Sequence, residues 1–120
     1  MLAAAEEKAF TLDDINPWCF STPASPYTAS VMEGRRADMG AIDRALERLS
    51  AARDPVLIEV AGGLMTPLSE IDTMRDLAAR WSCQVILVVP NRLGALAQAL
   101  ANTECLRAAG LALAAVVLND

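Results

Sequence analysis

Residues 85–118 read VILVVPNRLGALAQALANTECLRAAGLALAAVVL, and this stretch decides the fold of the 120-residue chain. It begins and ends with uninterrupted apolar runs, at 85–89 and 111–118, and these predict two buried strands. Between them, residues 93–109 have a helical pattern, and Gly110 stands where a helix end favours a residue that tolerates positive φ. Strands that are apolar throughout, with a helix between them, predict a parallel β-α-β unit whose sheet is covered on both faces.

The residues before this unit continue the alternation of helix and strand. Apolar residues three and four positions apart predict a helix from Asp38 to near Arg53, and VLIEV at 56–60 predicts a further buried strand. Ser69 and Asp72 resemble a capping box at the start of another helix. The apolar stripe expected on that helix consists of Ile71, Met74, Leu77 and Trp81. The fold class is therefore α/β, a parallel sheet with flanking helices.

The amino-terminal part of the chain has a different character. INPWCFSTPASPY, residues 15–27, contains three prolines, and each restricts itself and the residue before it, so a long helix is excluded there. We expect an irregular proline-rich segment at residues 1–37 and the β-α-β part of a single domain at residues 38–120.

Composition excludes several classes of partner. The net charge is −5 and Lys8 is the only lysine, so the basic patch of a nucleic-acid-binding protein is missing. No apolar run approaches the roughly 18 residues that a membrane span needs, and Glu6 and Glu7 interrupt what would be the apolar part of a signal peptide. We expect a cytoplasmic protein without a nucleic-acid or membrane partner.

Residue types limit the chemistry further. The chain has no histidine, which removes the commonest general base and the Ser-His and Cys-His nucleophile pairs. Its three cysteines form no C-x-x-C motif, so neither a zinc site nor a disulfide framework is indicated. Any chemistry must use carboxylates, backbone amides, hydroxyl groups and a hard metal ion.

Ligands of open parallel sheets bind outside the carboxyl ends of the strands. At these positions Glu59 suits Mg²⁺, which takes one or two carboxylates together with phosphate oxygens and water. Gly62 and Gly63 allow backbone N–H groups to approach an anion closely, and Asn119 offers both the donor and the acceptor that an adenine edge requires. Each of these residues also occurs as an ordinary turn or surface residue.

Taken together, four segments resemble dethiobiotin synthase, the ATP-dependent enzyme of biotin biosynthesis. The segments are INPWCFSTPASPYTAS, VLIEVAGGLMTPLS, VILVVPNRLG and GLALAAVVLND, and the resemblance runs from residue 15 to residue 120. It implies an incomplete P-loop NTPase-like three-layer fold and a homodimer. It also implies a ligase that uses MgATP to carboxylate 7,8-diaminononanoate with CO₂ and to close the dethiobiotin ring.

The resemblance also implies site residues. Glu59 corresponds to a Mg²⁺ ligand, and the helix start at Leu93 and Gly94 corresponds to the substrate-binding position. No catalytic residue of the family is matched. The positions that correspond to nucleotide contacts are Glu59, Val60, Ala61, Gly62, Asn119 and Asp120.

Departures from the family pattern concern the phosphate-binding part. The chain contains no G-x-x-x-x-G-K-[ST] motif and no counterpart of the catalytic Lys-Pro segment. Val60 replaces the first glycine of the E-G-A-G-G loop, and Tyr27 stands where the family usually has histidine. We therefore expect a truncated synthase, inactive alone. The alternatives are a non-catalytic dimerisation module derived from that fold, or a fragment of a cobyrinate-type amidotransferase synthetase, against which the proline-rich segment argues.

Overall fold

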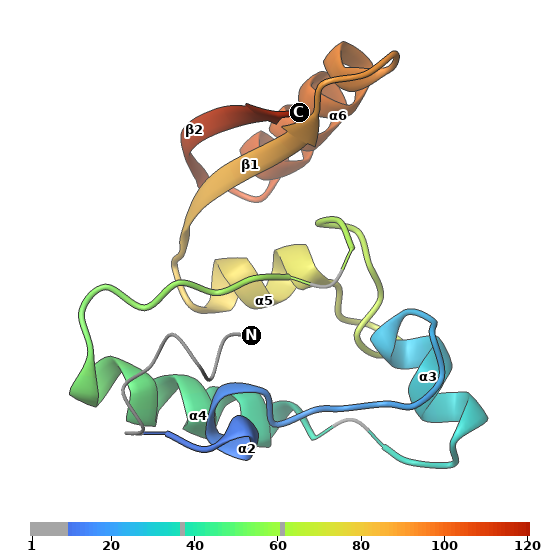
Figure 1. Cartoon of the computed structure of the whole chain (residues 1–120), viewed down its shortest axis with the longest axis vertical. Helices are drawn as coiled ribbons and strands as arrows, with labels where there is room; N and C mark the ends of the chain where they lie inside the picture. Colours follow the sequence, from blue (N-terminus) through green and yellow to red (C-terminus); the bar gives the residue numbers. More distant parts are fainter. Residues whose placement is uncertain (1–9, 37, 61) are drawn as a thin grey trace. The chain divides into compact units, whose positions relative to one another are not determined.

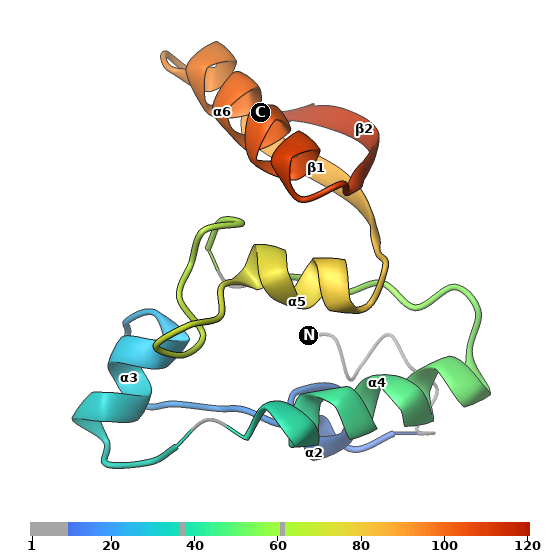
Figure 2. The same cartoon turned by 180° about the vertical axis from the view of Figure 1, so that it is seen from behind.

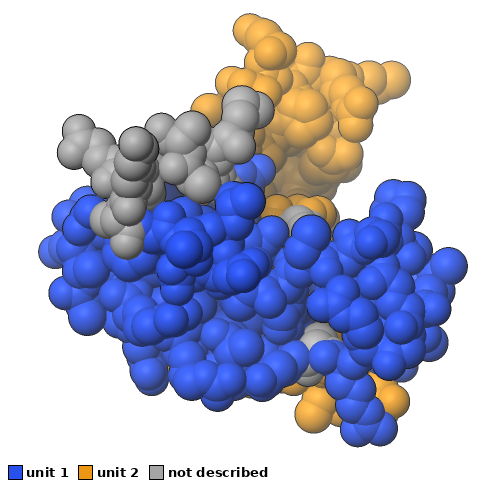
Figure 3. All heavy atoms as spheres, turned by 60° about the horizontal axis from the view of Figure 1, so that its bottom comes forward, with its two compact units in different colours: residues 1–59 blue, residues 60–120 orange. Residues whose placement is uncertain are grey.

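The computed structural model describes residues 10–36, 38–60 and 62–120 of the chain. Two compact units are distinguished, residues 1–59 and 60–120, which are coloured separately in Figure 3. The helices described in the first unit are α2 (Leu12–Ile15), α3 (Pro26–Met32) and α4 (Met39–Ala52) (Figure 1). The second unit contains α5 (Met74–Arg80), β1 (Gln84–Pro90), α6 (Ala95–Ala108) and β2 (Ala112–Asn119). Across the described ranges, no helix has the length and apolar character that crossing a membrane requires.

The proline-rich segment contains two short helices and irregular chain, and no long helix within its described residues, as predicted. α3 begins at Pro26, a position where proline costs little because the first helical N–H has no partner within the helix. The chain before α3 is held by two charged side chains. The Glu33 carboxylate accepts a hydrogen bond from the Thr22 N–H at 2.7 Å, and the Arg35 guanidinium donates to the Cys19 carbonyl at 2.9 Å.

α4 confirms the helix predicted from Asp38 to near Arg53. These two residues are its caps, and the helix itself runs from Met39 to Ala52. Ala45 is buried at the centre of one face, and the four apolar residues around it are partly buried: Met39, Ile42, Leu46 and Leu49. The three- and four-residue spacing therefore identified the face that packs.

The strand predicted at residues 56–60 does not form. Leu57, Ile58 and Val60 are 85%, 44% and 40% exposed, and the described strands pair only with each other. A strand needs a neighbour that satisfies its backbone N–H and C=O groups, and an apolar run does not supply one. The prediction failed because strand formation depends on this partner.

β1 and β2 confirm the predicted parallel pair. Their register runs from Gln84 opposite Ala112 to Pro90 opposite Asn119, with a shift between Val85 and Ile86. α6 connects the two strands and packs on one face of them; it lies behind the strands in Figure 1 and in front of them in Figure 2. Parallel strands joined by a crossover helix are the predicted β-α-β unit, and the fold class is α/β.

The two faces of this strand pair differ in exposure. Val89 is 2% exposed, and it lies on the face that α6 covers, as does the buried Leu106 of that helix. Side chains alternate between faces along a strand, and Ile86 and Val88 point to the other face, where they are 55% and 59% exposed. Within the second unit α6 packs on one face of the pair, and cover on the other face stays a prediction.

α5 begins later than predicted. Its capping box is formed by Thr73 and Asp76, whereas Ser69 and Asp72 form a tight turn before the helix. Ile71, expected on the buried stripe, lies outside the helix and is 88% exposed. Hydrogen bonds from the Thr73 hydroxyl and backbone N–H hold the pKa of Asp76 at about 2. Two S/T-x-x-D patterns occur in succession here, and the second one starts the helix.

α5 and α6 both end in the same kind of turn. At the end of α6, Leu111 N–H donates to Leu106 C=O at 3.0 Å and Gly110 N–H donates to Arg107 C=O at 3.1 Å, which is a Schellman motif. Gly110 has φ +67°, which confirms its predicted role. The turn after α5 repeats the pattern, with Ser82 at φ +53° in the position that Gly110 occupies after α6.

Candidate functional site

The carboxyl ends of β1 and β2 bring three polar residues together. Asn91, directly after β1, donates its backbone N–H to the Asn119 carbonyl at 2.9 Å. Its side-chain amide Nδ2 donates to Asp120 Oδ1 at 2.7 Å. All three residues are exposed, so the free edge of the Asn119 amide and the second Asp120 oxygen are accessible to a ligand. Asn119 and Asp120 are two of the predicted nucleotide contacts.

The predicted phosphate loop, residues 59–63, contains one glycine whose backbone has a positive φ angle. Gly62 has φ +87°, a conformation that residues with a side chain rarely adopt, whereas Gly63 lies outside that region. The Gly63 N–H donates to Thr66 Oγ1 at 2.9 Å, and the Thr66 N–H donates to the Gly63 carbonyl at 2.9 Å. Val60, before them, is 40% exposed, and Ala61 lies outside the described residues.

Glu59, the predicted Mg²⁺ ligand, is exposed and is the last residue of the first unit. The remaining predicted contacts belong to the second unit, so a meeting of Glu59 with Asn119 and Asp120 stays a prediction. In the parts of the chain that are described, no group of three or more Cys, Asp or Glu side chains could hold a metal ion. A single carboxylate fits Mg²⁺ when phosphate oxygens and water complete the coordination.

The start of α6 is the predicted substrate position. Leu93 is fully exposed, and Gly94 is the N-cap, with φ +97° and no side-chain hydrogen bond to the first turn. Ala95 N–H is bonded to the Arg92 carbonyl at 3.0 Å. The next N–H groups of a helix have no carbonyl partner within the helix, and the helix dipole makes this end positive. The geometry therefore suits a carboxylate.

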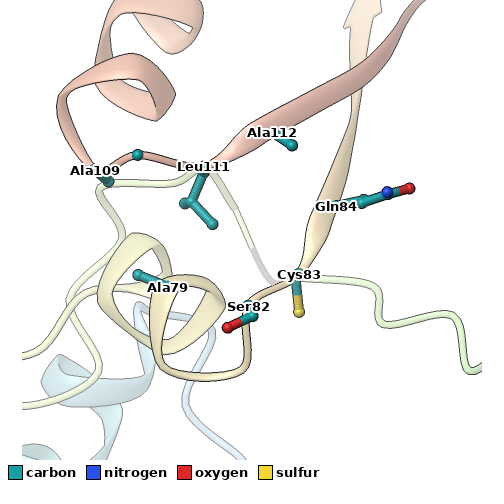
Figure 4. Close-up of a pocket in the computed structure, with 8 residues that line it drawn as sticks. Ala79, Ser82, Cys83, Gln84, Ala109, Leu111 and Ala112 are labelled. Atoms are coloured by element: carbon teal, nitrogen blue, oxygen red, sulfur yellow. The ribbon is translucent and has the colours of Figure 1, made fainter.

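A cavity of about 310 Å³ lies elsewhere, at the amino ends of β1 and β2 (Figure 4). It is formed by the two helix-to-strand turns, which lie side by side. Its lining carries no charged side chain and consists of Ala79, Ser82, Cys83, Gln84, Ala109, Gly110, Leu111 and Ala112. Burial raises the pKa of the Cys83 thiol. None of the predicted site residues lines this cavity, so it is not part of the predicted site.

Two residues that contact the predicted site were not assigned to it from sequence. Asn91 follows β1 as Asn119 follows β2, so the rule that selected Asn119 could also have selected Asn91. Thr66 stands three residues after Gly63, and a hydroxyl at this spacing is typical of a side-chain-stabilised turn. That spacing is common, so it would have been a weak signal.

Comparison with known proteins gives a consistent result. The model of a family described as an AAA domain matches residues 3–120. A protein from Anaeromyxobacter sp. named ATP-dependent dethiobiotin synthetase BioD is 40% identical over 119 residues, which cover 99% of this chain and 53% of the relative. Proteins of the same name from Aromatoleum aromaticum and Serratia marcescens are 41% and 39% identical, covering 90% and 99% of this chain and 48% and 52% of the relatives. The chain spans about half the length of the curated relatives it matches.

Proposed function

We propose that this chain, which belongs to the AAA domain family, supplies part of an ATP-dependent dethiobiotin synthetase. Dethiobiotin synthetase is the type of protein that the sequence predicts. The proposed reaction joins CO₂ to 7,8-diaminononanoate as a carbamate and closes the ring to dethiobiotin. MgATP, when bound, supplies the phosphoryl group that activates the carbamate oxygen. The proposed assembly is a cytoplasmic homodimer.

The junction of Asn91, Asn119 and Asp120 is the observation that carries this proposal. An amide side chain can donate from its NH₂ group and accept at its oxygen. An adenine edge offers the matching acceptor, a ring nitrogen, and the matching donor, its amino group. The Asn91 bond at 2.7 Å fixes one oxygen of Asp120 and leaves the other as an acceptor for a base amino group. The two strand ends are therefore the proposed recognition edge for adenine, and the residues that form it are exposed.

The phosphate side of the proposed site is the loop from Glu59 to Gly62. Glu59 would hold Mg²⁺ together with phosphate oxygens, and the loop backbone at Val60, Ala61 and Gly62 would contact the phosphates. Gly62 supports this role because its φ of +87° is a conformation of anion-binding nests.

The amino end of α6 is the proposed position for the substrate carboxylate. Leu93 and Gly94 carry no charge of their own, and the attraction comes from backbone N–H groups and the helix dipole. The absence of a side-chain cap at Gly94 leaves this end of the helix open to an anion.

Base recognition is tested by calorimetric titration with MgADP and MgGDP. The chain is expected to bind MgADP more tightly, and Asn119→Ala is expected to weaken MgADP binding about tenfold, the effect of losing one bidentate base contact. Asn102→Ala is the matched control, because the Asn102 amide bonds to the Gln98 carbonyl within α6. Absent MgADP binding, equal binding of both nucleotides, or equal losses in the two variants would overturn the proposed base site.

Turnover is tested separately. The chain contains no Gly-Lys-Ser or Gly-Lys-Thr, and phosphoryl transfer depends almost entirely on positioning and electrostatics. The 120-residue chain is therefore expected to form no dethiobiotin from diaminononanoate, bicarbonate and ATP, as measured by mass spectrometry. Addition of a separate polypeptide that carries the P-loop part of a relative is expected to restore formation. Product from the chain alone would contradict the expectation that turnover requires the P-loop part.

A non-catalytic dimerisation module is the second candidate. Its support is the exposed apolar face of the strand pair at Ile86 and Val88. This candidate predicts self-association without MgADP binding, so the same titration separates the two functions.

A further inference from the structure

Thr66 is hydrogen-bonded to Gly63, in the predicted phosphate loop, through both its backbone and its side chain. Its N–H donates to the Gly63 carbonyl at 2.9 Å, and its Oγ1 accepts from the Gly63 N–H at 2.9 Å. The two bonds join the same pair of residues and form a small ring. This ring fixes the orientation of the peptide that follows Gly62.

The same hydroxyl lies directly beside Gly62. A Cβ atom built on Gly62 would stand 2.6 Å from Thr66 Oγ1, closer than side-chain carbon atoms approach other atoms. The space that Gly62 leaves is therefore filled by Thr66. The left-handed conformation of Gly62 and the position of the Thr66 hydroxyl depend on each other.

Thr66 is itself anchored to the first turn of α5. Met74 N–H donates to the Thr66 carbonyl at 3.0 Å, and Arg75 N–H donates to the Leu64 carbonyl at 2.8 Å. Leu64 is 7% exposed, so the loop is also held by a buried side chain. The Thr66 hydroxyl thus belongs to a framework that extends from a helix to Gly63.

From these contacts we propose that Thr66 is the positioning residue of the predicted phosphate loop. This inference rests on the proposed function, in which the loop through Gly62 contacts the phosphates. Thr66 holds Gly62 at its positive φ and engages the Gly63 N–H, so the Gly63 N–H is not available to a phosphate. The phosphate contacts are then made by the loop residues before Gly63.

The test compares Thr66→Val, which keeps the shape of threonine without its hydroxyl, with Thr66→Ser, which keeps the hydroxyl. The first measurement is amide hydrogen exchange at Gly63 by NMR in the ligand-free chain. Thr66→Val is expected to accelerate this exchange about fivefold, the effect of losing one neutral hydrogen bond, and Thr66→Ser is expected to restore the wild-type rate.

Thr103→Val is the matched control. Its hydroxyl donates to the Ala99 carbonyl within α6 at 2.8 Å, so the variant loses a hydroxyl bond in the same unit that does not involve Gly62, Gly63 or Thr66. It is expected to leave Gly63 exchange unchanged. Equal Gly63 exchange in Thr66→Val and wild type, or equal acceleration by Thr103→Val, would overturn the positioning role.

The second measurement is the MgADP dissociation constant of the same proteins. Thr66→Val is expected to raise it about fivefold, while Thr66→Ser and Thr103→Val stay near wild type. An unchanged constant in Thr66→Val, with accelerated Gly63 exchange, would show that the loop is positioned by Thr66 but does not bind the nucleotide, and would overturn the inference. Absent MgADP binding in wild type would instead refute the proposed function, and Gly63 exchange would still decide whether Thr66 fixes the loop.

Discussion

Gly62 and Gly63 are neighbours in the chain with different backbone requirements. Gly62 has φ +87° and no space for a Cβ atom, whereas Gly63 lies outside the left-handed region and has open space where a Cβ atom would stand. Gly62→Ala is therefore expected to lower the free energy of unfolding by about 1–3 kcal/mol, the cost of strain at such a position. Gly63→Ala is expected to change it by less than about 0.5 kcal/mol.

Urea denaturation followed by circular dichroism measures both variants. Equal losses of unfolding free energy in Gly62→Ala and Gly63→Ala would show that the loop relaxes around either side chain. This result would contradict the proposal that the Gly62 conformation depends on Thr66. Glu59→Ala provides a third comparison in the same region, because Glu59 is exposed and its removal is expected to leave stability within about 0.5 kcal/mol.

At the residue scale, the sequence predicted which residue types lie at strand ends but not how each is held. Asn119 was selected because ligands bind beyond parallel strands, and Asp120 because the family resemblance implies it. The structure places both beside Asn91. Gly62 and Gly63 were selected as a pair, since a dipeptide of glycines does not indicate which one has positive φ. The Thr66 hydroxyl lies where a Cβ atom on Gly62 would stand, and local sequence does not predict this contact.

The turns after α5 and α6 are equivalent elements with different residues at the left-handed position. Ser82 has φ +53° and Gly110 has φ +67°, and both turns have the same pair of backbone hydrogen bonds. A residue with a Cβ costs about 1–2 kcal/mol in this conformation. Ser82→Gly is therefore expected to raise the free energy of unfolding by about 0.5–1 kcal/mol, part of the gain being offset by the added flexibility of glycine in the unfolded chain.

Gly110→Ala is the matched substitution in the opposite direction. Beyond the two chain neighbours, no atom lies within 4 Å of the added Cβ, so the expected loss of about 1 kcal/mol comes from the backbone conformation alone. Thermal and urea unfolding measure both variants. A loss of stability in Ser82→Gly would contradict the expectation and would mean that the Ser82 side chain stabilises the turn by more than its backbone strain costs.

At the element scale, the sequence predicted elements whose signals are local and missed one that depends on a partner. α4, α6 and the Gly110 turn follow from spacing and a single glycine, and all three are confirmed. The strand at 56–60 required a neighbouring strand, which an apolar run does not specify. The start of α5 was placed at the first of two similar capping patterns, because local sequence does not show which one the chain uses.

For the whole molecule, the family match and the observed sheet have to be considered together. The chain spans about half the length of its relatives, and the described sheet consists of β1 and β2 alone. Both strands are apolar and contain no charged residue. Parallel sheets of this composition are normally covered on both faces, so the open face and edges of this pair are surfaces that further polypeptide can cover.

Self-association follows from these surfaces. Ile86, Val88 and Val117 are 55%, 59% and 43% exposed, and edge strands without charged residues readily pair with another chain. The 120-residue chain is therefore expected to form a dimer or larger species at micromolar concentration, as measured by light scattering after gel filtration. Val88→Lys is expected to shift the mass towards the monomer, since a charge on this face opposes burial.

Gln98→Lys, on the exposed surface of α6, is the control for added charge and is expected to leave the mass unchanged. A monomeric wild type, or equal shifts in both variants, would show that the apolar strand face does not drive association.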